Sequence, residues 1–187
     1  MTHSNYKWVL LSILLLFNLS ISYSQNNANI TPIQKAPEFT LNDLSGNEIS
    51  MSDYSGQFVV IHIATTWCPF CNAEAPYLEK LSQEYASKNV KVFIIDVKEP
   101  LDLVKMKLQD KFNFSFPILL DSDGKVAASF APDVVLPDLA RDEVMLASNL
   151  IIDPNGQIQF MSLLDSKNFD AKLIALQKRL DELLQEN

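Results

Sequence analysis

The run QFVVIHIA, residues 57–64, is apolar at nearly every position, and a second run, VKVFIID, has the same character at residues 90–96. A continuous apolar run predicts a strand that is covered on both faces, whereas a half-exposed strand alternates apolar and polar residues. Residues 69–88, between the two runs, have a helical pattern. Two covered strands separated by a helix predict an α/β fold with helices on both sides of a mixed central sheet.

Shorter segments before and after these runs predict the flanking elements. EFTL and NEIS, residues 38–41 and 47–50, predict a leading hairpin around Gly46. Residues 101–113 predict a helix, and FPILL, residues 116–120, predicts a short strand. The leading hairpin therefore precedes the first covered strand, and the short strand follows the second.

The C-terminal part of the chain predicts a second hairpin and a closing helix. NLIID and QIQFMSLL, residues 149–153 and 157–164, flank the turn signal PNG. Five apolar residues are expected on one face of the closing helix: Phe169, Leu173, Leu176, Leu180 and Leu183. No internal repeat and no second linker occur, so one domain is expected.

The first residues have a different composition. Lys7 precedes the apolar run WVLLSILLLF, and a polar stretch with small residues follows. The pattern predicts a secretory signal over residues 1–24 with cleavage before Gln25, because the run is shorter than the roughly 20 residues that span a membrane. An uncleaved membrane anchor is the alternative. Residues 25–35 are polar and predict a flexible tether, which leaves residues 36–187 as the folded domain.

The charge of the chain excludes one class of partner. Its 187 residues carry a formal net charge of -8 and include only two arginines, Arg141 and Arg179. Binding to nucleic acid depends on clustered Lys and Arg that contact phosphates. No nucleic-acid partner is therefore expected.

The chain has only two cysteines, Cys68 and Cys71, and they follow the first covered strand directly. A structural zinc site needs four ligands, and the chain after residue 24 adds only one histidine, His62. Attachment of haem requires a histidine after the second cysteine, where this chain has Asn72. A purely structural disulfide remains an alternative, but a loop this short would stabilise the fold by only about 2 kcal/mol.

Redox catalysis explains the two cysteines best. Cys68 is expected near the N-cap of a helix, with Pro69 at the first helical position. The free N–H groups and the helix dipole favour a thiolate there, so Cys68 is predicted as the nucleophile. Cys71 lies one turn further along and is predicted as the resolving thiol.

The sequence around WCPFC resembles the thioredoxin superfamily, and more narrowly its TlpA-like (redoxin) branch of exported thiol:disulfide oxidoreductases. The matching segments are APEFTLNDLSGNEISMSDYSGQFVVIHIATTWCPFC, NAEAPYLEKL and NLIIDPNGQI. The resemblance covers about residues 36–187. It implies a thioredoxin-like fold with an added N-terminal β-hairpin, a redox-active Cys68–Cys71 disulfide, and no cofactor beyond the cysteines.

The resemblance also implies where and with what the protein works. It implies export, to a bacterial periplasm, and disulfide-containing client proteins. It favours the reductase direction, with electrons from a membrane-bound or exported thiol donor, and a monomer. The dipeptide between the cysteines, Pro69 and Phe70, does not fix the reduction potential.

Several further residues match family positions. Trp67 is expected to shield the disulfide and to contribute to docking, with a core aromatic as the alternative. Pro76 matches a proline that kinks the active-site helix. Glu74 matches an acid that tunes the cysteines, although a solvated helix charge is the alternative. Glu99, after the second covered strand, matches a second acid less closely.

His62 lies six residues before Cys68, where thioredoxin has a buried aspartate that accepts a proton. His62 is therefore a candidate acceptor for the proton of Cys71. A hydrogen-bonded core histidine is the alternative reading.

One feature departs from the superfamily, in which a cis-proline precedes the penultimate strand. Leu146 and Ala147 stand in this substrate loop, and Ala147 holds the place of the proline. The nearest proline, Pro137, lies within APDVVLPDLARDEV, a segment that is about ten residues longer than the usual connection and so predicts an insertion before that strand. Either Ala147 replaces the proline with a trans bond, or Pro137 folds back to serve.

The departure keeps two other functions open. Peroxiredoxins share the fold, lack the cis-proline, and use a Thr three residues before the peroxidatic Cys together with an Arg. Thr65 and Arg141 fit a thiol peroxidase that uses Cys68, whereas Ile61 occupies the position of an expected proline. A non-catalytic thioredoxin-like binding module is the other alternative.

Overall fold

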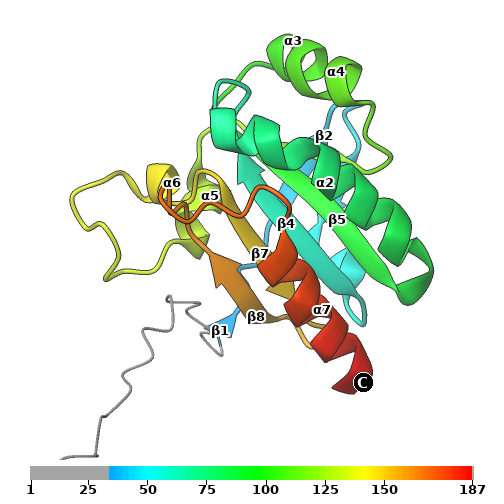
Figure 1. Ribbon diagram of the computed structural model, residues 1–187. Helices are drawn as coiled ribbons and strands as arrows, with labels where there is room; N and C mark the ends of the chain where they lie inside the picture. The colour runs from blue at the N-terminus through cyan, green and yellow to red at the C-terminus, as the bar shows by residue number, and fades with distance from the viewer. Residues whose placement is uncertain (1–33, 187) are drawn as a thin grey trace, which may run out of the picture.

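The computed structural model describes residues 34–186, which form one sheet of eight strands with helices on both faces (Figure 1). The strand order is β1-β8-β7-β4-β5-β6-β2-β3. At its centre β4 (Phe58–Ala64) pairs in parallel with β5 (Val90–Val97). Every residue of β4 is buried, and so is every residue of β5 except Lys91. The two covered strands that the apolar runs predict are confirmed.

Strands on both sides of this pair make the sheet mixed. β6 (Ile118–Asp121) pairs in parallel with β5. β7 (Ser148–Ile152) pairs with β4 in the antiparallel direction and forms a hairpin with β8 (Gln157–Ser162). The predicted short strand and the predicted C-terminal hairpin are therefore confirmed.

The two edges of the sheet come from the N-terminal part of the domain. The predicted leading hairpin is β2 (Thr40–Asp43) with β3 (Glu48–Ser50), and β2 pairs with β6. The opposite edge is β1 (Gln34–Lys35), which pairs with β8. These two residues end the segment that the sequence predicts as a tether, whereas the predicted signal lies outside the described residues.

Two long helices cover one face of the sheet. In Figure 1, α2 (Pro69–Tyr85) and α7 (Ile174–Glu186) lie on the same side of it. Leu78 of α2 and Leu180 of α7 join a buried cluster with Val60 of β4. The opposite face is covered by η1 (Met51–Tyr54) and α5 (Lys125–Phe130), together with Met145.

The ends of the helices differ in part from the predicted bounds. The short η2 (Ala86–Lys88) follows α2, and Asn89, with a φ of 57°, ends it before β5. The closing helix begins only at Ile174. Phe169 and Leu173, which were expected on this helix, precede it, because the left-handed φ of 58° at Leu173 interrupts helical geometry.

The segment predicted as one helix over residues 101–113 is helical but not uniform. It consists of α3 (Leu101–Val104), a π-helical turn η3 (Lys105–Gln109) and α4 (Asp110–Phe112).

No helix of residues 34–186 is both long enough and apolar enough to cross a membrane.

The predicted insertion lies between α5 and β7, and ends in the single turn of α6 (Arg141–Val144). Its irregular part, residues 131–140, extends away from the sheet (Figure 1). The Arg141 guanidinium donates hydrogen bonds to the carbonyls of Pro132 at 2.7 Å and Val135 at 3.1 Å. Hydrogen bonds from this one guanidinium therefore hold the loop, which has no helix or strand over residues 131–140.

Candidate active site

The two cysteines lie where β4 gives way to α2. Cys68 is the N-cap residue and Pro69 is the first residue of the helix, as the sequence predicts. The backbone N–H of Cys71 donates to Cys68 Sγ at 3.2 Å, so the sulfur takes the place of an oxygen in a helix cap. Asn72 fixes the turn, because its side-chain amide donates to the carbonyls of Thr66 at 2.9 Å and Cys68 at 2.8 Å.

The two thiols are unbonded to each other and differ sharply in acidity. A hydrogen bond from the Cys71 thiol lowers the pKa of Cys68 to about 6, and the N–H groups of Cys71 and Phe70 add to this effect against the opposing effect of burial. The same hydrogen bond, burial and the nearby Cys68 raise the pKa of Cys71 well above its usual range. The pair therefore carries one thiolate, and it resides on Cys68.

The aromatic residues of the motif have separate positions. The Trp67 side chain is 67% exposed beside Cys68, which excludes the core-aromatic alternative. Phe70 packs edge-on against Phe169, with ring centroids 4.9 Å apart. Pro76 lies within α2 and its side chain is exposed. Phe70 thus connects the dithiol turn with the segment that precedes α7.

His62 belongs to a buried polar cluster under the start of α2. The register of β4 and β7 sets His62 opposite Asn149. His62 Nδ1 lies 2.9 Å from Asn149 Oδ1, and Asn149 Nδ2 donates to Glu74 Oε1 at 3.0 Å. All three residues are at most 3% exposed. Glu74 is therefore not a solvated helix charge, and His62 is not an isolated core residue.

The hydrogen bonds of this cluster assign its protons. Because Asn149 Oδ1 can only accept, His62 donates from Nδ1, and its Nε2 keeps a lone pair. That Nε2 has no hydrogen-bond partner among the described residues. Burial lowers the pKa of His62 to about 4 and raises the pKa of Glu74 to about 8. At neutral pH both groups are therefore mainly uncharged.

Two neighbouring carboxyl groups, those of Glu99 and Asp96, lie beside the turn that leads to Cys68. Thr66 donates to the carboxylate of Glu99 through its N–H and, at 2.7 Å, through its hydroxyl. Glu99 in turn neighbours Asp96 at the end of β5. Burial, the charge of Glu99 and a hydrogen bond with it raise the pKa of Asp96 to about 8. The Asp96 oxygens have no other hydrogen-bond partner among the described residues, and the raised pKa keeps this carboxyl group mainly protonated at neutral pH.

Asn149 and Asp96 were missed by the sequence reasoning. Asn149 follows Ser148 at the start of β7, SNLII, and Asp96 lies near the end of β5 in FIIDV, so each interrupts a buried strand that is otherwise mainly apolar. A buried polar side chain needs a partner, so such an interruption is itself a signal of a polar cluster.

The substrate loop has an unusual backbone. No cis peptide bond occurs in residues 34–186, and Pro137 is exposed on the insertion. Ala147 holds the place before β7 with a φ of 59°, and its N–H donates to the carbonyl of Ile63 at 2.9 Å. The N–H of Leu146 is already bonded to the carbonyl of Glu143 at 3.3 Å. In this structure Ala147, rather than Pro137, faces the end of β4.

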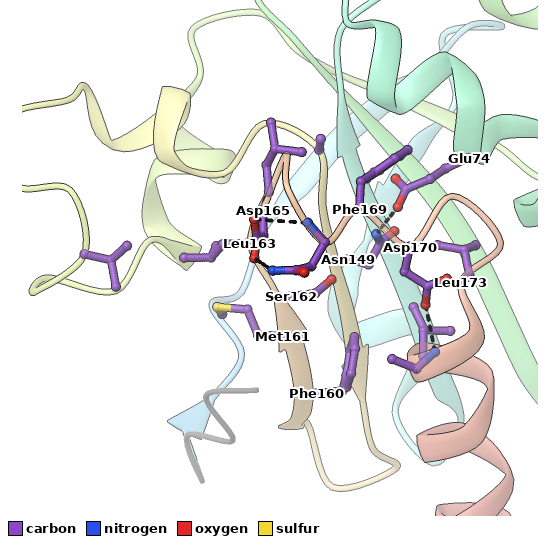
Figure 2. A pocket seen from close by; sticks show the side chains of 16 residues that line it. Glu74, Asn149, Phe160, Met161, Ser162, Leu163, Asp165, Phe169, Asp170 and Leu173 are labelled. Atoms are coloured by element: carbon purple, nitrogen blue, oxygen red, sulfur yellow. Dashed lines mark hydrogen bonds between the residues drawn. The ribbon is translucent and has the colours of Figure 1, made fainter. Parts of the chain in front are cut away.

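A cavity of about 510 Å³ adjoins this loop. Figure 2 shows Glu74 pointing into it from α2 toward Asn149, with Phe160 on β8 and Phe169 and Leu173 on the segment before α7. Ala147 and Val135 also line it. The cavity therefore extends from the buried polar cluster to the insertion.

The peroxidase residues do not converge on Cys68. The donors of Arg141 are directed at carbonyls of the insertion. The Thr65 hydroxyl is buried and has no hydrogen-bond partner among the described residues.

Within residues 34–186, no three side chains of His, Cys, Asp or Glu gather as a metal site requires.

A mixed sheet with a dithiol at the start of its first long helix defines a thioredoxin-like protein, and comparison with known proteins agrees with this class. The chain belongs to the AhpC/TSA family, whose model matches residues 32–161. The family resemblance and the fold expected from the sequence are therefore confirmed.

Individual relatives are named for disulfide chemistry. The chain is 33% identical over 124 residues to the thiol-disulfide oxidoreductase ResA of Geobacillus kaustophilus, a match that covers 66% of this chain and 64% of that protein. It is 30% identical over 157 residues to ResA of Halalkalibacterium halodurans, which covers 81% and 82% of the two chains. The chain thus matches less than two thirds of the Geobacillus protein.

A solved structure supports the fold. The secreted disulfide oxidoreductase of Mycobacterium tuberculosis, homologous to E. coli DsbE, superposes with a TM-score of 0.62 at 22% identity. The superposition covers 77% of this chain and 95% of that one.

Proposed function

We propose that the protein is a thiol:disulfide oxidoreductase that exchanges electrons with disulfides through Cys68 and Cys71. The observation that carries the proposal is the asymmetry of the two thiols. Cys68 caps a helix with a pKa lowered to about 6, whereas Cys71 is buried and its pKa is raised. A thiolate at neutral pH is both a nucleophile and a good leaving group, which exchange requires.

The proposed reaction has two steps. The Cys68 thiolate attacks one sulfur of a client disulfide, forms a mixed disulfide and releases the first client thiolate. Cys71 then loses its proton and attacks Cys68 Sγ, which releases the second client thiolate and leaves a Cys68–Cys71 disulfide. The two protein thiols are oxidised, the client disulfide is reduced, and the proton of Cys71 compensates one released thiolate.

The second step needs a proton acceptor, because Cys71 does not ionise unaided near neutral pH. We propose that His62 takes this proton at Nε2, the buried nitrogen with a free lone pair. His62 lies on the same face of β4 as Val60 and Ala64, which is the face that α2 covers. Glu74 lies on α2 and contacts His62, and its ionised form is the second candidate acceptor.

We propose the reductase direction, in which the protein reduces client proteins and receives electrons from a membrane-bound or exported thiol donor. The sequence resemblance supports this direction. Equilibration of the Cys68–Cys71 pair with glutathione buffers measures its reduction potential. A potential well above that of the glutathione pool would reverse the direction to that of an oxidase.

The test of the exchange function is alkylation of the reduced protein over a pH series. Cys68 should react with iodoacetamide with a midpoint of about pH 6, while Cys71 stays unreactive. Cys71→Ala removes the thiol donor and should raise the midpoint, whereas Cys71→Ser keeps a hydroxyl donor and should change it less. Equal reactivity of both cysteines with a midpoint near that of a free thiol would favour the non-catalytic binding module.

We also propose export, with residues 1–24 as a cleaved signal, on the basis of the charge and apolar pattern described above. Intact-mass analysis of the protein from its native host is the test. A mass that begins at Gln25 supports cleavage, and a full-length chain recovered from membranes would identify an anchor instead.

A further inference from the structure

The insertion before β7 presents apolar side chains to solvent although its backbone is fixed. Val134 is 88% exposed and Leu136 is 56% exposed. The carbonyls around them are bound by Arg141, so the exposure does not come from a loose chain. Exposed apolar side chains on a held backbone are a feature of interaction surfaces.

This surface is continuous with the proposed exchange site. Val135, between the two exposed residues, lines the cavity that also contains Ala147 and Glu74. Phe169 lines the same cavity and contacts Phe70, which lies between the two cysteines. A polypeptide whose disulfide reaches Cys68 can therefore extend over the cavity onto the insertion.

The insertion also has more acidic side chains than basic ones, since Arg141 is its one basic residue. Asp133 and Asp138 alternate with its apolar residues, and Glu143 follows on α6. Asp133 and Asp138 form no ion pair with any residue of 34–186, whereas Lys98, which pairs with Asp142, also interacts with the charge of Glu143. Asp165 and Asp170 line the adjoining cavity, and no Lys or Arg of the described residues lines it, so the acidity of the insertion continues into the cavity.

We propose that residues 131–140, with the adjoining cavity, bind the client polypeptide through apolar residues that Lys or Arg flank, next to the client disulfide. The apolar residues cover Val134 and Leu136, and the basic residues pair with Asp133 and Asp138. This inference rests on the proposed exchange function and names its client class. It assigns substrate selection to the insertion, where the superfamily uses its cis-proline loop.

The test compares rates of disulfide reduction by the reduced full chain. The substrates are disulfide-linked dimers of short peptides in which the cysteine has Leu-Val on one side and Lys-Lys on the other. Matched peptides carry Glu-Glu for the lysines or Ser-Ser for the apolar pair. Hydroxyethyl disulfide, which is too small to reach the insertion, reports the chemistry alone.

The wild type should prefer the apolar and basic peptide. Val134→Ser combined with Leu136→Ser should lower kcat/KM for it by about tenfold, as expected when two apolar contacts are lost. Asp133→Asn combined with Asp138→Asn should reduce the preference for Lys over Glu by about threefold, and less at high salt. Both pairs should reduce hydroxyethyl disulfide at the wild-type rate. Met106→Ser and Asp110→Asn, exposed changes on the distant η3 and α4, should alter none of these rates.

Three outcomes overturn the proposal, and they can be told apart. Equal rates for all peptides in every variant would remove the insertion from client binding while leaving the exchange function intact. A dimer in sedimentation that Val134→Ser and Leu136→Ser dissolve, with unchanged peptide rates, would assign the surface to a second copy. Failure of the wild type to reduce even hydroxyethyl disulfide would refute the exchange function itself.

Discussion

His62 Nδ1 lies 3.4 Å from Glu74 Oε2 in a part of the core where neither residue is more than 3% exposed. Asn149 bridges them, because it accepts from His62 and donates to Glu74. Without the bridge, the two groups would be a buried base and a buried acid with few partners, which is costly. With it, one polar atom of each group has a hydrogen-bond partner, which lowers this cost.

Replacement of His62 by Leu should slow the second step of exchange more than the first. If His62 accepts the proton of Cys71, resolution of the mixed disulfide should slow by up to about a hundredfold, the lower range for a positioned acid or base. Attack by Cys68 should be nearly unchanged. Stopped-flow measurement of formation and of resolution gives both rates on the same sample, so a loss of folded protein does not imitate the effect.

Ile61→Val is a matched control, because Ile61 lies on the opposite face of β4. It should affect both steps equally. A folded His62→Leu variant that resolves at the wild-type rate would return His62 to a packing role and leave Glu74 as the acceptor. Glu74→Gln should then slow resolution by a comparable factor.

Trapping experiments test the order of the cysteines. Cys71→Ser should accumulate mixed disulfides with client proteins, because the second step is lost while the Cys68 thiolate remains. Cys68→Ser should accumulate none, because Cys71 is buried and its pKa is raised. Non-reducing electrophoresis with mass spectrometry identifies the adducts. Equal trapping by the two variants would contradict the assignment of nucleophile and resolving thiol.

The two buried carboxyl groups predict the dependence of stability on pH. The pKa of Glu74 is raised from 4.5 to about 8 and that of Asp96 from 3.8 to about 8, so the folded state holds protons that the unfolded chain has lost. The free energy of unfolding should therefore fall as pH rises from 6.5 to 8, by at most about 1.4 kcal/mol per pH unit for each group. His62 acts in the opposite direction, but only below pH 6.5.

Urea denaturation at several pH values measures this slope. Cys68 also opposes it, since its lowered pKa adds stability between about pH 6 and 9, so the comparison is made in the Cys68→Ser background. Glu74→Gln and Asp96→Asn should each make the slope shallower, whereas Asp102→Asn, at an exposed position on α3, should not. A slope that neither variant changes would show that these carboxyl groups ionise normally.

Most of the fold could be predicted because it depends on local patterns. The apolar runs of β4 and β5 and the turn signals of both hairpins are visible in neighbouring residues. The position of Cys68 at the start of α2 likewise follows from the strand before it and from Pro69. These features need no knowledge of which distant segments meet.

The parts that could not be predicted depend on tertiary pairing. His62 and Asn149 are 87 positions apart, and only the register of β4 with β7 brings them together. The start of α7 was misplaced because the apolar spacing continues through Leu173, whereas its backbone is left-handed. The apolar period reports a buried face, and it does not report where helical geometry begins.

Ala147 shows the same dependence on tertiary contacts. Alanine in the left-handed region costs roughly 1–2 kcal/mol, so no propensity favours it there. Its N–H bond to the carbonyl of Ile63 at the end of β4 holds this conformation. The backbone of the loop therefore differs from that of a proline at the same place, for which φ is fixed near −65° and no N–H exists.

Restoring the superfamily proline at this position should therefore damage the protein. Ala147→Pro removes the hydrogen bond to Ile63 and cannot adopt a φ of 59°, so the free energy of unfolding should fall by about 3 kcal/mol or more. Ala147→Gly should instead stabilise the fold by up to about 1 kcal/mol, because glycine tolerates this φ. Ala140→Pro is the control, since Ala140 has a φ of -59° and its N–H makes no hydrogen bond within residues 34–186. Urea denaturation compares the three. A stable Ala147→Pro variant would show that this loop converts to the proline geometry, and that its conformation is not fixed by the contact with β4.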